Sequence, residues 1–235
     1  MKIDEIIKKF PDDQRTQDWE KKRLGMFTGS AMGKYMASSK TKGETFGATA
    51  KDALYKLAGE RMLSQLTLTD EVAWDEYKHQ TSIWSKAIQF GVDHEEIARS
   101  TYEFQSGLQV KTCGSVVSET IDNLSASPDG LAMDGDRMIC WECKCPMPHT
   151  AVKYMAEIKD AETLKKANSD YYWQVMTEML VTGADAADFS VYCPFLEVPM
   201  KTVRIERDEE ACKTIEERVK AGNEFVDAII ESIRN

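Results

Sequence analysis

The stretches 127-SPDG-130 and 141-WECK-144 decide how this sequence is interpreted. Asp129 stands in a tight turn, because the proline before it restricts the backbone and the glycine after it permits a reversal. Glu142 and Lys144 follow as a charged pair inside an apolar run. Burying such charges costs free energy unless they have partners or a task. The two stretches therefore predict a functional site carried by the strands of a sheet.

The second stretch lies within a predicted strand over 138–145, in which alternate side chains face opposite ways. One face is apolar and is expected to pack on the core; it carries Ile139, Trp141, Cys143 and Cys145. The other face brings Glu142 and Lys144 together. A plainer alternative is that these two residues form an ion pair on an exposed face of the sheet.

A metal site is the chemistry that these charges favour. If Asp129 ends a neighbouring strand, it can lie beside Glu142, and two carboxylates so close repel each other unless a cation neutralises them. Oxygen ligands favour Mg²⁺, with Mn²⁺ as an expected substitute. Lys144 would then orient or deprotonate an attacking water, or neutralise charge as a phosphoryl group gains a fifth ligand.

A third carboxylate comes from a helix predicted over 82–105. Apolar or small residues recur at helical spacing on one face, which carries Trp84, Ile88, Gly91, Glu95, Ala98 and Tyr102. Glu95 stands in the middle of this face. A glutamate on a core-facing stripe needs a cation, a hydrogen-bond network or a metal as its partner.

Length and composition suit a single α/β domain over 1–235. Its catalytic core is expected over about 82–206, with N-terminal helices and a basic loop over 1–66 and a C-terminal helix over 208–233. No apolar run is long enough to cross a membrane, and the N-terminus does not resemble a secretory signal. Six cysteines in such a chain are expected to be reduced thiols, as in the cytoplasm.

The charge is distributed unevenly along the chain. A net charge of −10 argues by itself against a nucleic-acid partner. Residues 21–60, however, carry eight Lys and Arg against three acids, a local charge of +5, whereas 208–235 carries eight acids against four bases. A basic patch on an acidic body fits a protein that holds a polyanion on one face, and a solvated loop with chance lysines is the alternative.

The remaining pattern fills in the α/β arrangement. It predicts two short helices within 1–24 separated at Pro11, a loop over 25–48, a helix over 49–66, an exposed polar segment over 67–82, further strands over 113–119, 124–127, 187–193 and 201–206, a helix from an Asp170 N-cap to Gly183, and a last helix from Asp208 whose apolar stripe ends at Ile233. These elements predict a central mixed sheet flanked by helices.

Other chemistries find less support in the sequence. Cys140, Cys143 and Cys145 lack the spacing of a zinc site, and strand alternation places the first on the face opposite the other two. The glycine-rich segments lack a Walker-type ending. No G-x-S-x-G motif supports serine hydrolysis. The aromatic run 171–173 fits helix packing better than base stacking.

With these motifs in place, the chain resembles a known family. The shared motifs, in order, are Trp19-x-x-x-Arg23-x-Gly25 with Thr28-Gly29-Ser30, the block from Gly91 to Arg99 with Tyr102-Glu103-Phe104-x-Ser106-Gly107, Ser127-Pro128-Asp129-Gly130-Leu131, Glu142-Cys143-Lys144-Cys145-Pro146, and Tyr172-Trp173-Gln174. They resemble the phage lambda exonuclease and YqaJ-type viral recombinase family, within the PD-(D/E)XK nuclease superfamily. The resemblance implies a restriction-endonuclease-like α/β core.

The resemblance also implies residue roles. Glu95, Asp129, Glu142 and the backbone carbonyl of Cys143 would bind Mg²⁺, Lys144 would be the catalytic lysine, and Gln174 would orient it or the water. Arg23, Ser30 and Ser127 would hold a 5′-phosphate. Ile88 matches a residue that wedges into the terminal base pair, although a core position is an equal alternative. The family's arginine after the Glu-x-Lys-Cys-Pro block is missing, and His149, Lys153 or Arg137 is a candidate to replace it.

The implied function is a Mg²⁺-dependent 5′→3′ exonuclease of phage or prophage recombination. It would digest linear duplex DNA from a 5′-phosphate end, release mononucleotides and leave a 3′ single-stranded tail for an annealing recombinase. The family is expected to form a homotrimeric ring around DNA in the cytoplasm of a bacterial host. The alternatives are a related endonuclease or single-strand nuclease, or a DNA-binding scaffold without catalysis.

Overall fold

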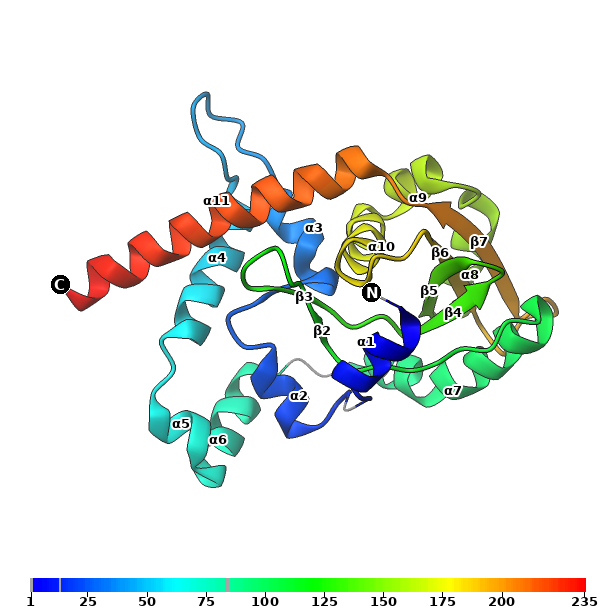
Figure 1. Cartoon of the computed structure of the whole chain (residues 1–235), viewed down its shortest axis with the longest axis horizontal. Helices are drawn as coiled ribbons and strands as arrows, with labels where there is room; N and C mark the ends of the chain where they lie inside the picture. Colours follow the sequence, from blue (N-terminus) through cyan, green and yellow to red (C-terminus); the bar gives the residue numbers. More distant parts are fainter. Residues whose placement is uncertain (1, 13, 83–84) are drawn as a thin grey trace.

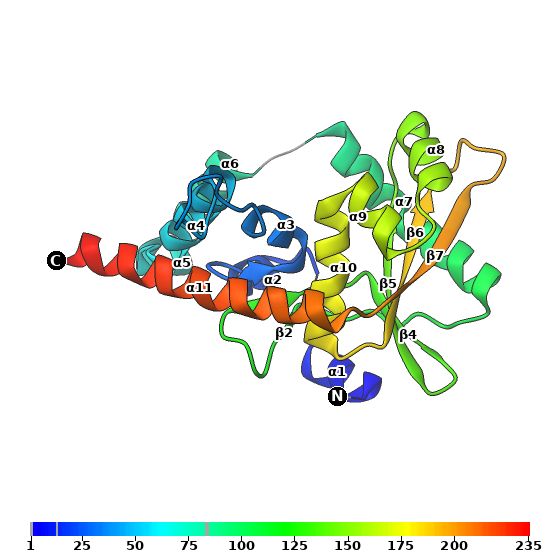
Figure 2. The same cartoon turned by 90° about the horizontal axis from the view of Figure 1, so that it is seen from above.

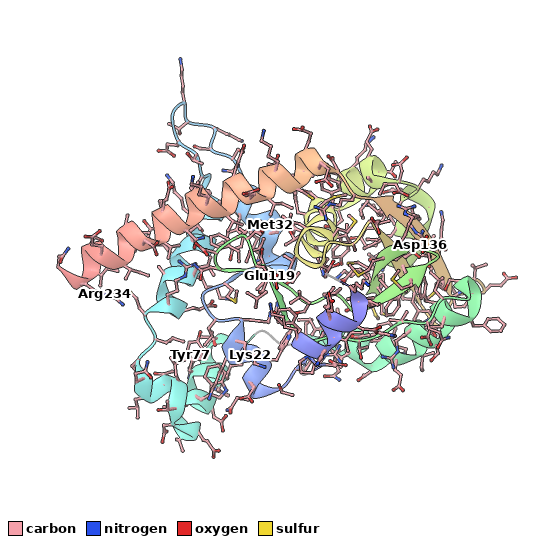
Figure 3. The ribbon with its side chains drawn as sticks, viewed as in Figure 1. Lys22, Met32, Tyr77, Glu119, Asp136 and Arg234 are labelled. Carbon is pink, nitrogen blue, oxygen red and sulfur yellow. The ribbon has the colours of Figure 1, made fainter. Side chains whose placement is uncertain are left out.

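The protein is described by a computed structural model over residues 2–12, 14–82 and 85–235. Its main sheet has the strand order β4 (Gly130–Asp134), β5 (Arg137–Lys144), β6 (Ala186–Tyr192) and β7 (Met200–Glu206). β5 and β6 are parallel and the outer pairs are antiparallel, so the sheet is mixed as the sequence predicts. β4 and β5 form a hairpin whose turn contains Asp136, labelled in Figure 3.

Helices cover both faces of this sheet, as Figures 1 and 2 show. α7 (Lys86–Ser106) packs on β5 and β7, whereas α10 (Ser169–Thr182) packs on the opposite face against β5 and β6. β5 is therefore buried on both sides, and Glu142 is only 2% exposed. The alternative of an ion pair on an exposed sheet face is wrong, because α10 covers the face that carries the charges.

A second, smaller sheet lies beyond α10. It consists of β1 (Phe27–Thr28), β3 (Leu124–Ala126) and β2 (Val116–Val117), with β3 in the middle. α10 contacts this sheet as well as the main one, so it stands between the two (Figure 2). The sequence predicts β2, β3, β5, β6 and β7, and it does not predict the strand nature of β1 and β4, which are short or lie beside a turn.

The N-terminal region adds a group of mostly short helices around this centre. They are α1 (Ile3–Lys9), α2 (Gln17–Lys22), the 3₁₀ turn η1 (Gly29–Ala31), α3 (Met32–Tyr35), α4 (Ala48–Arg61), α5 (Gln65–Thr69) and α6 (Glu71–Thr81). Most residues of the predicted polar segment over 67–82 are exposed as expected, but the segment is helical and one residue, Trp74, is buried. Trp74 packs this segment against the rest of the protein, which the polar composition of the segment does not predict.

The C-terminal half is completed by α8 (Pro148–Glu157), α9 (Ala161–Ala167) and α11 (Glu209–Arg234). α11 begins after its predicted cap Asp208 and crosses the molecule over α4 and α10 (Figure 1). Its predicted stripe is buried except for Ile233, which is exposed near the free end. Asp170 does not cap α10; Asn168 does, because its side chain accepts hydrogen bonds from the backbone N–H groups of residues 170 and 171.

The helix predicted over 82–105 requires a second correction. α7 begins at Lys86, and Trp84 lies outside the described residues. Only the later half of the stripe is buried, through Ala98 and Tyr102, whereas Ile88 is 50% exposed. Tyr102 stacks on Trp141 of β5 with ring centroids 5.4 Å apart. α7 is thus fixed at its C-terminal half and projects past the sheet at its start.

Among the described residues, every helix is either too short or too polar to traverse a lipid bilayer.

Candidate active site

The turn that contains Asp129 leads directly into the hairpin of β4 and β5. Gly130 pairs with Trp141, so Asp129 precedes β4, rather than ending a strand, and lies beside Glu142. One oxygen of Asp129, Oδ2, accepts a hydrogen bond from the backbone N–H of Cys143 at 2.8 Å. A Cβ at Gly130 would stand 2.1 Å from a methyl carbon of Val110, so this close approach requires glycine.

Glu142, Lys144 and Gln174 form a hydrogen-bonded network between β5 and α10. Lys144 Nζ donates to Glu142 Oε1 and, at 3.1 Å, to Gln174 Oε1. Gln174 Nε2 donates to the same Glu142 oxygen at 2.7 Å. The strand alternation and the helix register thus bring three of the predicted catalytic side chains into direct contact.

The electrostatics of this cluster reflect buried charges in close proximity. Burial raises the pKa of Asp129 well above its ordinary value, and the charges of Glu142 and Glu95 add to the effect. Burial lowers the pKa of Lys144, but the carboxylates of Glu142 and Asp129 outweigh it, so that the pKa of Lys144 lies above the ordinary value. The cluster therefore favours a charged lysine and disfavours a second free carboxylate.

Glu95 reaches the same region from α7, one turn before the buried Ala98. Its Oε2 forms an ion pair with Arg15, which precedes α2 and has a positive φ of 67°. Gln14 holds this segment in place, since its Nε2 donates to the carbonyls of Cys113 and Pro128 at 2.8 and 3.1 Å. The partner that the sequence requires for Glu95 is thus supplied, in this state, by an arginine.

A single pocket of about 540 Å³ collects the predicted metal ligands. We call it the carboxylate pocket; its lining includes Ile88, Glu95, Asp129, Glu142, Cys143, Lys144, Cys145, His149 and Tyr171. Gln174 is not part of the lining and reaches it through Glu142 and Lys144. Ile88 faces the pocket, so its assignment to the core is wrong.

The candidates to replace the missing arginine differ in position. His149 lies at the wall of the carboxylate pocket. Lys153 is exposed on α8 and does not line this pocket. Arg137 begins β5, at the end opposite Lys144, and pairs with Glu206. It does not reach across to the carboxylate pocket.

Two of the three predicted phosphate residues lie at a second pocket, of about 700 Å³, which we call the arginine pocket. Arg23 and Ser30 line it, with a guanidinium nitrogen 3.5 Å from the Ser30 hydroxyl. The Arg23 guanidinium stacks on Trp19 at 4.0 Å, and the Trp19 indole N–H donates to Ser127 Oγ at 3.3 Å. Tyr77 of α6, labelled in Figure 3, contributes to the wall.

Arg23 in the arginine pocket has one buried N–H group, at Nε, that is not hydrogen-bonded within the described residues. Burial lowers the pKa of Arg23, with Glu20 and Glu60 acting in the opposite direction. A half-buried guanidinium with one unpaired N–H fits an anion such as phosphate. Ser127 lines neither pocket, but it bonds Trp19 of the arginine pocket and lies two residues before Asp129 of the carboxylate pocket, so the turn over 127–129 runs between them.

The donor set fits a divalent ion in part. Glu142 Oε2 is buried with no partner among the described residues, and the crowded carboxylates require a cation. Over 2–12, 14–82 and 85–235, however, no three His, Cys, Asp or Glu side chains are arranged to hold an ion as they stand. Arg15 holds Glu95, so Glu95 must rearrange to join Asp129 and Glu142.

Two residues of this region escape sequence reasoning. Arg15 carries no motif and reaches Glu95 only through the fold. Glu178 is buried one turn after Gln174 and accepts a hydrogen bond from its Nε2 at 2.9 Å. The spacing of four residues between Gln174 and Glu178 places both on one helix face, which is a signal that the sequence contains.

The mixed sheet between helices, with an acid before one strand and Glu-x-Lys on the next, defines the PD-(D/E)XK class of α/β folds. A sequence profile described as "YqaJ-like viral recombinase domain" matches residues 18–185, and the chain belongs to this family. The resemblance drawn from the motifs is confirmed. No curated protein sequence gives a significant match.

Solved structures agree with this assignment. The crystal structure of an alkaline exonuclease (LHK-Exo) from Laribacter hongkongensis is 28% identical, with a TM-score of 0.73 over 93% of this chain and 96% of that one. The same figures apply to LHK-Exo in complex with dAMP. A phage related exonuclease from Haemophilus somnus 129PT, 19% identical with a TM-score of 0.66 over 88% and 96% of the two chains, shares the fold.

Proposed function

We propose that this protein is a Mg²⁺-dependent exonuclease that digests linear duplex DNA in the 5′→3′ direction during phage or prophage recombination. The observation that carries the proposal is the juxtaposition of Asp129 and Glu142 with Lys144 in one pocket, next to a second pocket with a half-buried, partly unpaired Arg23. Membership of a viral recombinase family and the similarity to the alkaline exonuclease LHK-Exo support it.

Asp129 and Glu142 would hold the ion, together with Glu95 and the backbone carbonyl of Cys143. A bound Mg²⁺ would supply Lewis-acid polarisation of the phosphate and activation of a water. Glu142 uses Oε1 for Lys144 and Gln174. Its Oε2, which has no partner in the part of the chain that the structure describes, would be its ligand atom. Mn²⁺ is expected to substitute, because it accepts the same oxygen ligands.

Lys144 would then stabilise the negative charge that develops on the attacked phosphate. The surrounding carboxylates favour its charged form, so charge stabilisation suits it better than proton abstraction. Its ammonium is held by Glu142 and Gln174 and lies 4.9 Å from the Tyr171 ring centroid. These contacts orient the ammonium before the substrate arrives.

Arg23, Ser30 and Ser127 would bind the terminal 5′-phosphate at the arginine pocket. Because Ser127 and Asp129 belong to one turn, a phosphate held there would place the next phosphodiester bond at the carboxylate pocket. This geometry would restrict cleavage to the first nucleotide and so release mononucleotides. Ile88 and His149, at the wall of the carboxylate pocket, would contact the duplex end.

The assembly belongs to the same proposal. A homotrimeric ring would let the basic residues of 21–60 face DNA while the acids of the net −10 chain face solvent. The 3′ single-stranded tail would pass to an annealing recombinase in the cytoplasm of a bacterial host. Sedimentation of the purified protein, with and without duplex DNA, tests the ring: a monomer in both conditions contradicts it.

Digestion of a labelled duplex tests the activity. The purified protein is incubated with Mg²⁺ and linear duplex DNA labelled at one 5′ end, with or without a 5′-phosphate. Early release of labelled mononucleotide, faster with the phosphate and abolished by EDTA, is the expected result. Internal fragments or digestion of closed circles would indicate an endonuclease instead, and DNA binding without cleavage under Mg²⁺ or Mn²⁺ would indicate a scaffold.

A further inference from the structure

Glu178 is a buried acid to which the proposed reaction assigns no role. It lies in α10 with 1% of its surface exposed, at a position where an apolar residue would pack. One of its oxygens, Oε2, has no hydrogen-bond partner among the described residues. A buried carboxylate with an unmet oxygen destabilises a fold. The stability of α10 therefore does not explain its presence.

The contacts of Glu178 point to Gln174. The Gln174 amide nitrogen donates both of its hydrogens, to Glu142 Oε1 at 2.7 Å and to Glu178 Oε1 at 2.9 Å. The amide oxygen accepts from Lys144 Nζ at 3.1 Å. Rotation of the amide by 180° would set its oxygen against two carboxylate oxygens and its NH₂ against an ammonium. The two glutamates thus permit only one orientation of the amide.

Glu142 and Glu178 differ in the other contacts that their carboxylates make. Glu142 Oε1 also accepts a hydrogen bond from Lys144, and Glu142 is a proposed metal ligand. Its hydrogen bond to Gln174 therefore competes with Lys144 and with the ion. Glu178 is outside the lining of the carboxylate pocket, and its bond to Gln174 is the one that a bound ion does not claim. Both Gln174 and Glu178 are on one turn of the same helix, which makes this bond local and geometrically fixed.

We propose that Glu178 is a positioning residue, which locks the side-chain amide of Gln174 so that its oxygen faces Lys144. It acts through Gln174 and touches neither the DNA nor the ion. This inference rests on the proposed nuclease function, because it assigns Glu178 to the orientation of the lysine that would stabilise charge on the phosphate. An acid retained at a cost in stability for the sake of a site fits this role.

Three variants test the proposal. Glu178→Met removes the acceptor and keeps an unbranched side chain, and Glu178→Gln keeps an acceptor oxygen. Thr177→Val is the matched control, because Thr177 is equally buried in α10 and its hydroxyl donates to the backbone carbonyl of Trp173, away from Gln174 and Lys144. For each variant, kcat and KM are measured on 5′-phosphorylated duplex at saturating Mg²⁺, and the urea midpoint of unfolding is measured in EDTA.

We expect kcat of Glu178→Met to fall about tenfold or more with KM unchanged within twofold, while the urea midpoint stays equal or rises. We expect Glu178→Gln to lose less than half of the kcat that Glu178→Met loses. Thr177→Val should keep the wild-type kcat. A structural role for Glu178 would instead lower the midpoint in step with the activity, and that result overturns the proposal. An unchanged kcat in Glu178→Met overturns it as well.

A readout independent of turnover separates this inference from the proposed function. The side-chain NH₂ resonances of Gln174 in a ¹⁵N spectrum, assigned by their loss in Gln174→Leu, report the amide in the metal-free protein. We expect a shift and faster hydrogen exchange in Glu178→Met and no change in Thr177→Val. If the wild type cleaves DNA but these resonances do not respond, the positioning role is wrong. If they respond but the wild type never cleaves DNA, the proposed function is wrong.

Discussion

In the part of the chain that the structure describes, the two pockets leave opposite kinds of polar atom without a hydrogen-bond partner: an acceptor in one and a donor in the other. The carboxylate pocket gathers acids around Lys144, whereas the arginine pocket holds the half-buried Arg23. Among the described residues, Glu142 Oε2 and Arg23 Nε have no hydrogen-bond partner. The unmet atom of the first pocket is an acceptor, which suits a cation, and that of the second is a donor, which suits an anion. Each unmet atom is costly in the free protein, and Mg²⁺ and a phosphate would relieve the two costs separately.

The difference predicts a division of labour. Groups in the carboxylate pocket should act on the rate of bond cleavage, and groups in the arginine pocket should act on recognition of the DNA end. Since the Ser127–Asp129 turn joins them, the two functions should be coupled only through the position of the bound strand. Substitutions in each pocket test this division.

The largest effect is expected from Lys144→Ala. Removing the ammonium that faces the reacting phosphate should lower kcat by about 10²–10³-fold, with DNA binding retained within a fewfold. Rapid-quench assays for kcat and equilibrium binding to a 5′-phosphorylated duplex measure the two quantities. Lys220→Ala, which removes an exposed lysine of α11 outside both pockets, is the control and should change neither. Equal loss of binding and rate in Lys144→Ala would contradict the division of labour.

Arg23→Ala should give the next largest effect and the opposite signature. Loss of a charge-assisted contact of about 1.5–3 kcal/mol should reduce kcat/KM about 10–150-fold on 5′-phosphorylated ends. Rates on 5′-hydroxyl ends should hardly change, so the preference for phosphate should disappear. Arg23→Lys retains the charge without the forked geometry and the stacking on Trp19, and should recover only part of the preference. A preference that survives in Arg23→Ala would move the phosphate site elsewhere.

The carboxylate pocket is the part of the molecule that the sequence reveals best. Strand alternation places Glu142 and Lys144 on one face, and the turn chemistry around Asp129 places it beside them. These rules are local, and the fold preserves them. The depth of burial is not local, because it depends on α10 covering that face, and so the exposed ion pair remains a fair alternative until the layers are known.

The start of α7 and the loop before α2 make contacts that the sequence pattern does not predict. Helical periodicity treats Ile88 and Tyr102 alike, yet only the later half of α7 meets the sheet, so Ile88 faces the pocket. Arg15 meets Glu95 across 80 positions of sequence, and no pattern encodes that contact. A period reports which residues share a face, but tertiary packing determines what that face meets.

Glu178→Gln tests how much the ionisation of a buried acid beside the carboxylate pocket lowers the free energy of unfolding. Burial raises the pKa of Glu178 well above its ordinary 4.5, and the charge of Glu142 adds to the shift. A raised pKa in the folded state means that the stability contributed by protonated Glu178 is complete below 4.5 and is lost as the pH rises through the folded pKa. Glutamine cannot ionise and avoids that loss.

The variant should therefore gain stability over the wild type as the pH rises. In EDTA, the difference in unfolding free energy should be small at about pH 4.5 and reach about 1–3 kcal/mol in favour of Glu178→Gln at alkaline pH. Urea unfolding across this range measures it. A difference that does not change with pH would mean that Glu178 has no raised pKa and that the carboxylate pocket carries no such cost.

Ser127→Ala should give the smallest effect, because it removes a single hydroxyl from the link between the pockets. The Trp19 indole N–H then loses its acceptor, and a bond of about 1 kcal/mol corresponds to about a fivefold loss in kcat/KM on 5′-phosphorylated ends. Ser232→Ala, on the last turn of α11, is the control and should have no effect. If the loss in Ser127→Ala persists on 5′-hydroxyl ends, the hydroxyl fixes the turn before Asp129 rather than the phosphate, and the boundary between the two pockets is less sharp than their opposite charges suggest.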